Sequence, residues 1–167
     1  MELSLIFDII STTAVIIGVI FGLLQLRQYH SARKRESAIY LLNSFQTKDF
    51  IDGVWIVMGL PNGLSKKEIE KLVGDEDRLL GLVMSTWETI GILLFHHEVD
   101  IEMVDHAYSG PIRFSWQKLE KYVNDLRQEM ERETIFEWFQ WLADRMQERE
   151  SKKSPVPAHI AHRDWES

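Results

Sequence analysis

The chain has no cysteine and no excess of positive charge, and each absence excludes a class of protein. Without cysteine there is neither a disulfide framework nor a thiolate nucleophile. The 26 acidic residues outnumber the 19 lysines and arginines, so the formal net charge is −7. Phosphate binding needs a basic surface, which argues against nucleic acid as a partner. Nucleophilic triads and Walker-type phosphate loops are also missing. We therefore expect no catalytic residues, no cofactor and no enzymatic activity.

The beginning of the chain lacks charge. Between Leu3 and Leu26 the only charged residue is Asp8. A helix of about 20 mostly apolar residues spans the hydrocarbon core of a bilayer, which is about 30 Å thick. A cleaved signal peptide would begin with basic residues, and a core helix of a soluble domain would have a polar face; neither feature is present. Residues 1–26 are therefore predicted to be an uncleaved transmembrane helix, with the lipid bilayer as a partner.

Basic residues follow the apolar segment and determine its predicted orientation. They are Arg27, Arg33, Lys34 and Arg35. Lysine and arginine beside short spans collect on the cytoplasmic side, so we expect the N-terminus outside and the rest of the chain inside. The predicted location is the inner (plasma) membrane, with a single pass.

Gly18 and Gly22 stand about one helical turn apart within the apolar segment. This Gly-x-x-x-Gly spacing lets two transmembrane helices approach closely, which would favour self-association. Glycine is also frequent in spans that do not pair. Both interpretations of the spacing stay open.

Glycine and proline are absent from residues 23–52, so we expect the span to continue into the first cytoplasmic helix without a break. Beyond it, apolar residues recur at spacings of three and four, which is typical of helices. We predict an all-α protein in three parts: a transmembrane anchor (1–26), a cytoplasmic helical bundle (27–149) and a disordered polar tail (150–167).

Several helix ends carry residues that cap helices. The predicted N-terminal caps are Ser65 with Glu68 as a capping box, then Asp75 and Asp100, and the helix that follows Ser65 is expected to end at Gly74. Gly110 and Pro111 are expected to break the helix that follows Asp100. Two apolar faces in the C-terminal half are expected to lie in the core. They comprise Trp116, Leu119, Val123, Leu126 and Met130, and then Ile135, Trp138, Phe139, Leu142 and Met146, with Trp141 on that face or at its edge.

A second apolar segment, Leu79–Phe95, contains Glu88 as its only charge. It is short for a membrane span, and a carboxylate at its middle would be costly in lipid. We therefore expect a buried central helix rather than a second span. Buried charges are usually paired, and the candidate partners of the carboxylate are Arg113, Arg127 and Arg132. A perturbed carboxyl group of this kind is also a candidate functional site.

Potential metal ligands gather between His96 and His106, where the candidates are His97, Asp100 and His106. The His-Glu-x-x-His spacing of metalloproteases is missing, and adjacent histidines on a helix point about 100° apart, as its 3.6-residue repeat requires. We favour a helix end followed by the Asp100 cap, and keep a metal site as the alternative.

A set of short motifs in fixed order resembles a known family. After the apolar segment these are Arg35-Glu36-Ser37-Ala38, Trp87-Glu88-x-Ile90-Gly91, Val99-Asp100-Ile101, Trp116, Arg127, Phe136-Glu137-Trp138 and Leu142-Ala143. The order is similar to that of a bacterial family of small, single-span, membrane-anchored helical proteins known only as a domain of unknown function. The resemblance covers residues 1–147 and implies the architecture without implying an activity.

These features favour a non-enzymatic interaction or scaffold protein that acts at the membrane. Its partner would be another protein or a second copy of the chain. The alternatives are a subunit of an oligomeric pore or effector and a metal-dependent protein that uses the His96–His106 region.

Overall fold

The computed structural model describes residues 15–26, 47–152 and 156–166, together with the single residues 13, 29, 43 and 45. Throughout this part of the chain the regular structure is helical, without strands, which confirms the predicted fold class. The chain divides into two compact units, residues 1–40 and 41–167. The predicted topology residues Arg27, Arg33, Lys34 and Arg35 lie outside the described residues.

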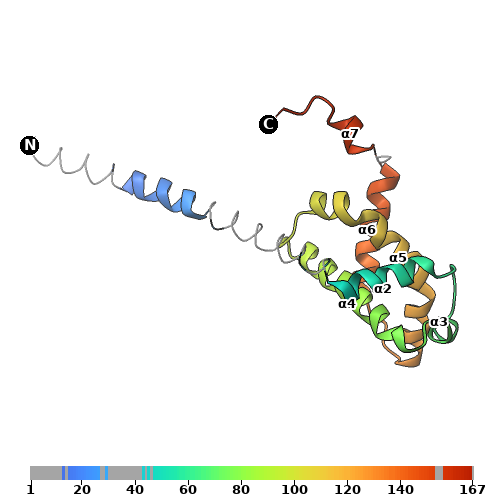
Figure 1. The fold of residues 1–167 in the computed structure, drawn as a ribbon. Helices are drawn as coiled ribbons and strands as arrows, with labels where there is room; N and C mark the ends of the chain where they lie inside the picture. The colour runs from blue at the N-terminus through green and yellow to red at the C-terminus, as the bar shows by residue number, and fades with distance from the viewer. Residues whose placement is uncertain are drawn as a thin grey trace, which may run out of the picture. The chain divides into compact units, whose positions relative to one another are not determined.

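The first unit contains an apolar helix, Val15–Leu26, drawn in blue in Figure 1. Each of its large apolar side chains is between 51% and 65% exposed. No atom lies within 4 Å of the position that a Cβ would take at Gly18 or Gly22. The helix lies within the predicted anchor, whose first residues are outside the described part.

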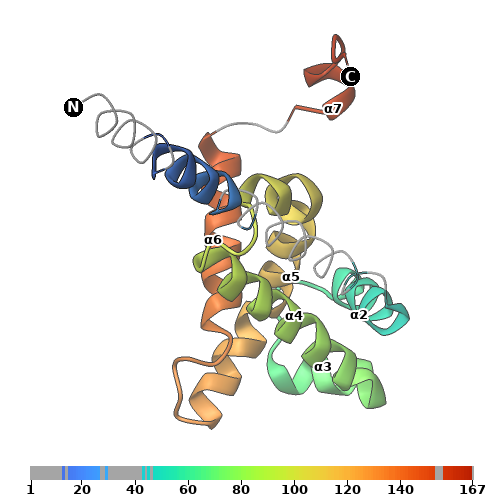
Figure 2. The same ribbon diagram turned by 90° about the vertical axis from the view of Figure 1, so that its left-hand side faces the viewer.

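The second unit is built from α2 (Lys48–Gly59), α3 (Lys66–Val73), a 3₁₀ turn η1 (Gly74–Glu76), α4 (Asp77–Phe95), α5 (Ile101–Glu129), α6 (Glu137–Lys152) and α7 (Ala158–Ala161). Figure 2 shows α4 between α2 and α6, and it packs against both. The long helix α5 packs against α6, α2 and α3. The central position of α4 explains why its sequence is almost free of charge.

The core of this unit is centred on α4. Trp87 is 1% exposed and lies at the edge of Phe50, with ring centroids 5.4 Å apart. Gly91 allows α6 to cross closely, because an added Cβ would lie 2.9 Å from the Trp138 carbonyl carbon and closer still to its oxygen. Gly53 of α2 meets the backbone of α4 in a similar way. The central-helix prediction for residues 79–95 therefore agrees with the packing.

One helical run in the described part, Lys66–Phe95, is long and apolar enough to cross a membrane, with a mean hydropathy of 1.4. Core helices of soluble domains meet the same criterion. Of its most apolar window, 44% is buried inside the protein. This burial supports the interpretation of α4 as a core helix.

Many of the predicted caps are confirmed. The Ser65 amide and hydroxyl both donate to the Glu68 carboxylate, at 2.8 and 2.6 Å. Gly74 ends α3 with a φ of +55°, a conformation that glycine adopts without strain. Asp100 accepts a hydrogen bond from the Glu102 amide at 2.8 Å at the start of α5.

Asp75 does not cap α4, so that prediction was wrong. It lies within η1, which connects α3 directly to α4. The prediction of an unbroken helix through residues 23–52 was also wrong near the C-terminal end of that range, because α2 begins only at Lys48. Thr47 has an extended conformation and its hydroxyl accepts from the Phe50 amide at 3.3 Å. A threonine can therefore interrupt a helix where glycine and proline are absent.

The predicted break at Gly110 and Pro111 is absent, since α5 is helical from Ile101 to Glu129. Proline removes one backbone donor and crowds the preceding turn, which bends a helix without always ending it. Figure 1 shows that the first turns of α5 run in a different direction from the rest. Ile112, directly after the proline, is fully buried, so packing offsets the lost hydrogen bond.

The two C-terminal faces are confirmed in large part. Leu119, Val123, Phe139, Leu142 and Met146 are fully buried. Met130, at the end of α5, is exposed instead. The helix α6 continues to Lys152, into the segment predicted to be the tail.

Candidate functional site

Glu88 lies on α4 and its carboxylate reaches the first turn of α6. One oxygen accepts the amide hydrogen of Phe139 at 2.7 Å. Burial raises the pKa of Glu88, while the hydrogen bonds from the Phe139 and Trp138 amides lower it in part. Glu137 adds a smaller upward effect and Arg127 a smaller downward effect on this pKa. The carboxylate therefore acts as a tertiary cap on α6.

The predicted arginine partner of Glu88 was wrong, because each candidate is engaged elsewhere. Arg113 forms an ion pair with Glu150, and Arg132 donates to the Thr134 hydroxyl at 3.0 Å. A buried carboxylate needs hydrogen bonds, and the free amides at a helix N-terminus supply them as well as an arginine does. The sequence around Glu88 does not indicate that the first turn of α6 packs against this side chain.

Arg127 is buried and holds the turn between α5 and α6. Its Nε donates to the Ile135 carbonyl oxygen at 2.9 Å, and its Nη1 donates to the Gln140 side chain at 2.8 Å. Two residues of the turn, Glu131 and Phe136, have positive φ values of 51° and 53°. Arg127 and Glu88 thus secure the same turn from two helices, a role that no pattern in the sequence indicates.

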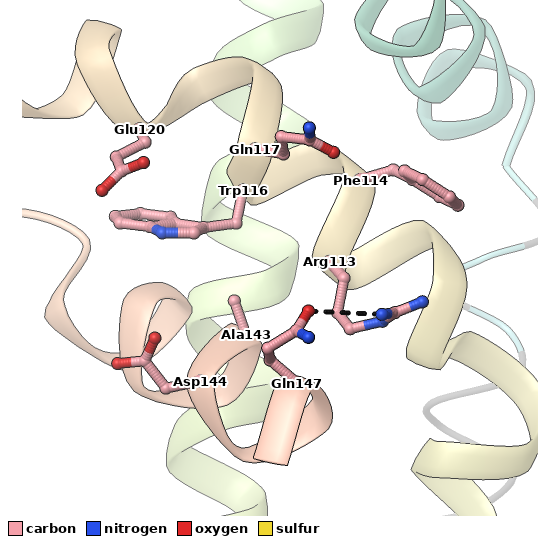
Figure 3. A pocket seen from close by; sticks show the side chains of 8 residues that line it. All are labelled: Arg113, Phe114, Trp116, Gln117, Glu120, Ala143, Asp144 and Gln147. Carbon is pink, nitrogen blue, oxygen red and sulfur yellow. Dashed lines mark hydrogen bonds between the residues drawn. The ribbon is translucent and has the colours of Figure 1, made fainter. Parts of the chain in front are cut away.

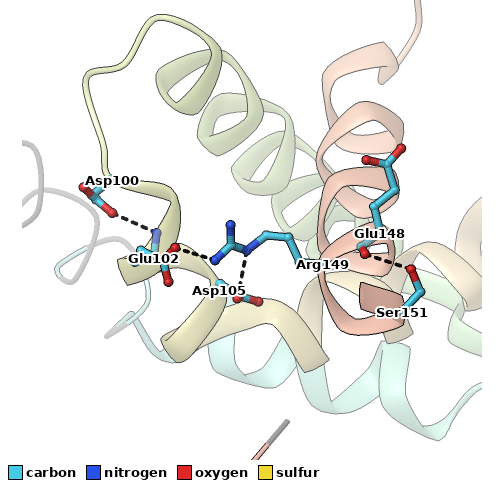
Figure 4. A network of polar contacts seen from close by, with 6 residues as sticks. All are labelled: Asp100, Glu102, Asp105, Glu148, Arg149 and Ser151. Carbon is cyan, nitrogen blue, oxygen red and sulfur yellow. Dashed lines mark hydrogen bonds and ion pairs between the residues drawn. The ribbon is translucent and has the colours of Figure 1, made fainter. Parts of the chain in front are cut away.

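The His96–His106 region forms a corner between α4 and α5, where its acidic residues serve structural contacts (Figure 4). Arg149 of α6 donates to Glu102 at 2.6 Å and to Asp105 at 2.9 Å. In the part of the chain that the structure describes, no group of three or more histidine, cysteine, aspartate or glutamate residues is placed to hold a metal ion. The candidate ligands His97, Asp100 and His106 are therefore not brought together as a metal site.

An aromatic patch lies where the end of α4 meets α6, and it comprises Phe95, Trp138 and Trp141. Phe95 is 49% exposed, and its ring centroid is 4.8 Å from that of Trp138 and 6.0 Å from that of Trp141. The guanidinium of Arg145 lies 5.9 Å from the Trp141 ring. Trp138 was predicted to be core but is only half-buried, because Phe139 occupies the inward position.

A cavity of 310 Å³ opens between α5 and α6 (Figure 3). Arg113 at one end donates to Gln147 at 3.2 Å. Trp116, Glu120 and Asp144 line the other end. The sequence does not indicate this cavity, because its two walls come from helices that are separated by the α5–α6 turn.

Comparison with known families adds one match. The family model named Domain of unknown function (DUF4760) matches residues 12–146. The chain belongs to the DUF4760 family. This confirms the predicted resemblance to an uncharacterised family, and the matched DUF4760 region includes the Val15–Leu26 helix. No curated protein and no solved structure matches the chain.

Proposed function

We propose that the protein is a membrane-anchored scaffold with one N-terminal span and a cytoplasmic helical domain. The observation that carries this proposal is the Val15–Leu26 helix, whose large apolar side chains are all more than half exposed. Apolar surface of this extent is unfavourable in water, and contiguous patches of it mark sites of membrane or protein contact. With the apolar residues that precede it in the sequence, the segment is long enough to span a bilayer.

The basic residues after the segment support the orientation with the N-terminus outside. Arg27, Arg33, Lys34 and Arg35 would remain on the cytoplasmic side of the membrane. The DUF4760 match begins at residue 12, so the apolar helix falls within the region typical of the family. This supports the proposal that the anchor is an integral part of the family's domain.

Contact with another protein, or with a second copy of the chain, is the proposed mode of action. The half-buried Glu88 and the buried Arg127 are engaged in holding α6 in place. The exposed aromatic side chains, including Trp55 at 72% exposure, are of the type that dominates protein interfaces. These features favour binding over chemistry.

The absence of cysteine allows a direct test of the anchor and its orientation. The variant N62C places one thiol in the exposed turn between α2 and α3, and S4C places one near the N-terminus. Both proteins should stay in the membrane pellet after alkaline carbonate extraction. In intact cells a membrane-impermeant maleimide should label S4C, and it should label N62C only after permeabilisation. Release by carbonate, or the reverse labelling pattern, would overturn the proposal.

The scaffold role is tested separately by chemical cross-linking in the native membrane, followed by purification in mild detergent. We expect one defined partner protein or a dimer of the chain. Recovery of the chain as a monomer without a cross-linked partner would contradict a scaffold role while leaving the anchor intact.

A further inference from the structure

Helix α4 exposes one face, although it is the central helix of the second unit. Four exposed residues follow one another along this face, and we call them the α4 seam: Leu82, Ser85, Thr89 and Ile92. The apolar side chains at its two ends, Leu82 and Ile92, are 38% and 37% exposed. The spacing of three, four and three residues is the one along which two helices pack against each other. The α4 seam therefore has the form of a helix-packing surface.

The α4 seam carries no charge, and its surroundings make few polar demands on a partner. The Thr89 hydroxyl donates to the Ser85 carbonyl oxygen at 2.8 Å. The neighbouring Thr86 hydroxyl donates to the Leu82 carbonyl oxygen at 2.7 Å. Both hydroxyl donors are thus satisfied within α4 itself. The surface that fits the α4 seam is uncharged and largely apolar.

The α4 seam is complementary to itself when a second copy lies antiparallel. About the midpoint of the seam, Leu82 of one copy lies opposite Ile92 of the other, and Ser85 lies opposite Thr89. Two crossing helices are closest at the middle of their contact and diverge towards its ends. Small side chains at the middle let the backbones approach, and larger ones at the ends fill the widening gap. A two-fold interface requires self-complementarity of this kind.

The charges at the two ends of α4 favour the antiparallel arrangement over the parallel one. Asp77 begins the helix and His96 and His97 follow its end, and all three are exposed. An antiparallel pair places each carboxylate near the imidazoles of the other copy, whose N–H groups donate to carboxylates, and brings opposite ends of the helix dipoles together. A parallel pair would instead place like charges side by side. Arg78, the cation next to Asp77, already pairs with Asp49 at 3.2 Å.

We infer that the partner of the α4 seam is a second copy of this chain, packed antiparallel across α4. The contact uses the same surface on both copies, so it produces a closed dimer. The inference rests on the proposed mode of action by protein contact and deepens it by naming the partner and the surface. It does not depend on the membrane anchor.

Disulfide trapping in the full-length protein tests the register, because the chain has no cysteine of its own. Chains with S85C and chains with T89C, each with its own tag, are co-expressed and oxidised in mild detergent. We expect the disulfide between unlike chains to predominate, because only this pairing brings the two Cβ atoms within the roughly 4 Å that a disulfide requires. Predominance of disulfides between like chains would indicate a parallel pair, and either that result or the lack of any disulfide would overturn the inference.

Charge variants test whether the α4 seam holds the dimer together. L82E/I92E should raise the dimer dissociation constant, measured by sedimentation in mild detergent, about tenfold or more because it places like charges against each other. The control L72E/M130E adds the same charge at apolar side chains of α3 and of the end of α5 that are 62% and 64% exposed, and it should keep the dimer. A dimer that survives L82E/I92E, as one held by Gly18 and Gly22 would, contradicts the inference, and so does an equal loss in the control.

The other occupants of the α4 seam give different results. A monomeric wild type would overturn the inference. If the S85C thiol of that monomer reacts with a water-soluble maleimide in detergent but not in lipid vesicles, the seam belongs to the bilayer instead. If the monomer still cross-links to another protein in the native membrane, the proposed scaffold role stands and this inference alone fails. A chain without any partner in both experiments would contradict both.

Discussion

Glu88 and Phe139 are joined across the interface between α4 and α6, where the carboxylate accepts the Phe139 amide hydrogen at 2.7 Å. The two residues are 51 positions apart in the chain. One side chain thus satisfies the free amides at the start of a distant helix and fixes where that helix begins. This contact allows α6 to pack on α4 without a local capping residue.

Removing the Glu88 cap should destabilise the domain. E88A leaves the amides at the start of α6 without their acceptor, which should cost about 1–2 kcal/mol of unfolding free energy. E88Q keeps an acceptor oxygen and removes the half-buried charge, so its cost should stay below about 1 kcal/mol. Chemical denaturation followed by tryptophan fluorescence measures both values. Equal losses in the two variants would contradict the capping role.

The stability contribution of Glu88 should depend on pH. Its pKa in the folded protein is raised above the ordinary value of 4.5, chiefly because the carboxylate is buried. The folded state then binds the proton more tightly than the unfolded state, so stability falls as pH rises through this interval. Relative to E88Q, the wild type should gain stability as the pH is lowered from neutral towards the ordinary value. Denaturation of both proteins over this range measures the difference, and a relative loss on acidification would show that the pKa is lowered instead.

Gly91 should not tolerate a side chain, whereas Gly81 should. An alanine Cβ at position 91 would collide with the Trp138 backbone, so G91A should destabilise the protein by about 1–3 kcal/mol. No atom lies within 4 Å of a Cβ at position 81, and G81A should stabilise helix α4 by up to about 1 kcal/mol. Melting temperatures of the two variants should therefore move in opposite directions. A neutral G91A would contradict the close crossing of α4 and α6.

Trp87 should contribute much more to stability than Trp55. Truncation of the buried Trp87 to alanine leaves a large cavity and should cost about 3–5 kcal/mol. Trp55 is largely exposed, so W55A should change the unfolding free energy by less than about 0.5 kcal/mol. Denaturant titrations of the two variants test this contrast. A strong effect of W55A on the isolated chain would indicate an intramolecular contact for Trp55.

Neutralising the basic flank should disturb the membrane orientation. Replacement of Arg27, Arg33, Lys34 and Arg35 by glutamine removes the positive residues that, in the proposed topology, keep this side of the span in the cytoplasm. Reporter fusions at the C-terminus should then show a mixture of orientations, unlike the wild type. Lys66, Lys67 and Lys71 provide a control set farther along the chain. An unchanged orientation after replacement of these four residues would contradict the proposed topology.

Local features were predictable from the sequence because they depend on neighbouring residues. The capping box of Ser65 and Glu68, the Gly74 helix end and the Asp100 cap each involve groups within one helical turn. The inward face of α6 also followed from its spacing, since a helix presents every third or fourth residue to one side. The prediction failed at Thr47, where a capping conformation takes the place of a continuous helix. It failed at Asp75, where a 3₁₀ turn takes the place of a helix cap.

The sequence by itself determined the all-helical class, the two ends of α3, the start of α5 and the apolar N-terminal segment, because periodicity and capping are short-range effects. Tertiary structure alone decided that α5 continues through Pro111, that Glu88 caps α6, and that Trp116, Glu120 and Asp144 meet at one cavity. These outcomes depend on which helices pack together. Burial and contact between distant residues supply the free energy that overrides a local proline signal or selects a backbone amide over an arginine.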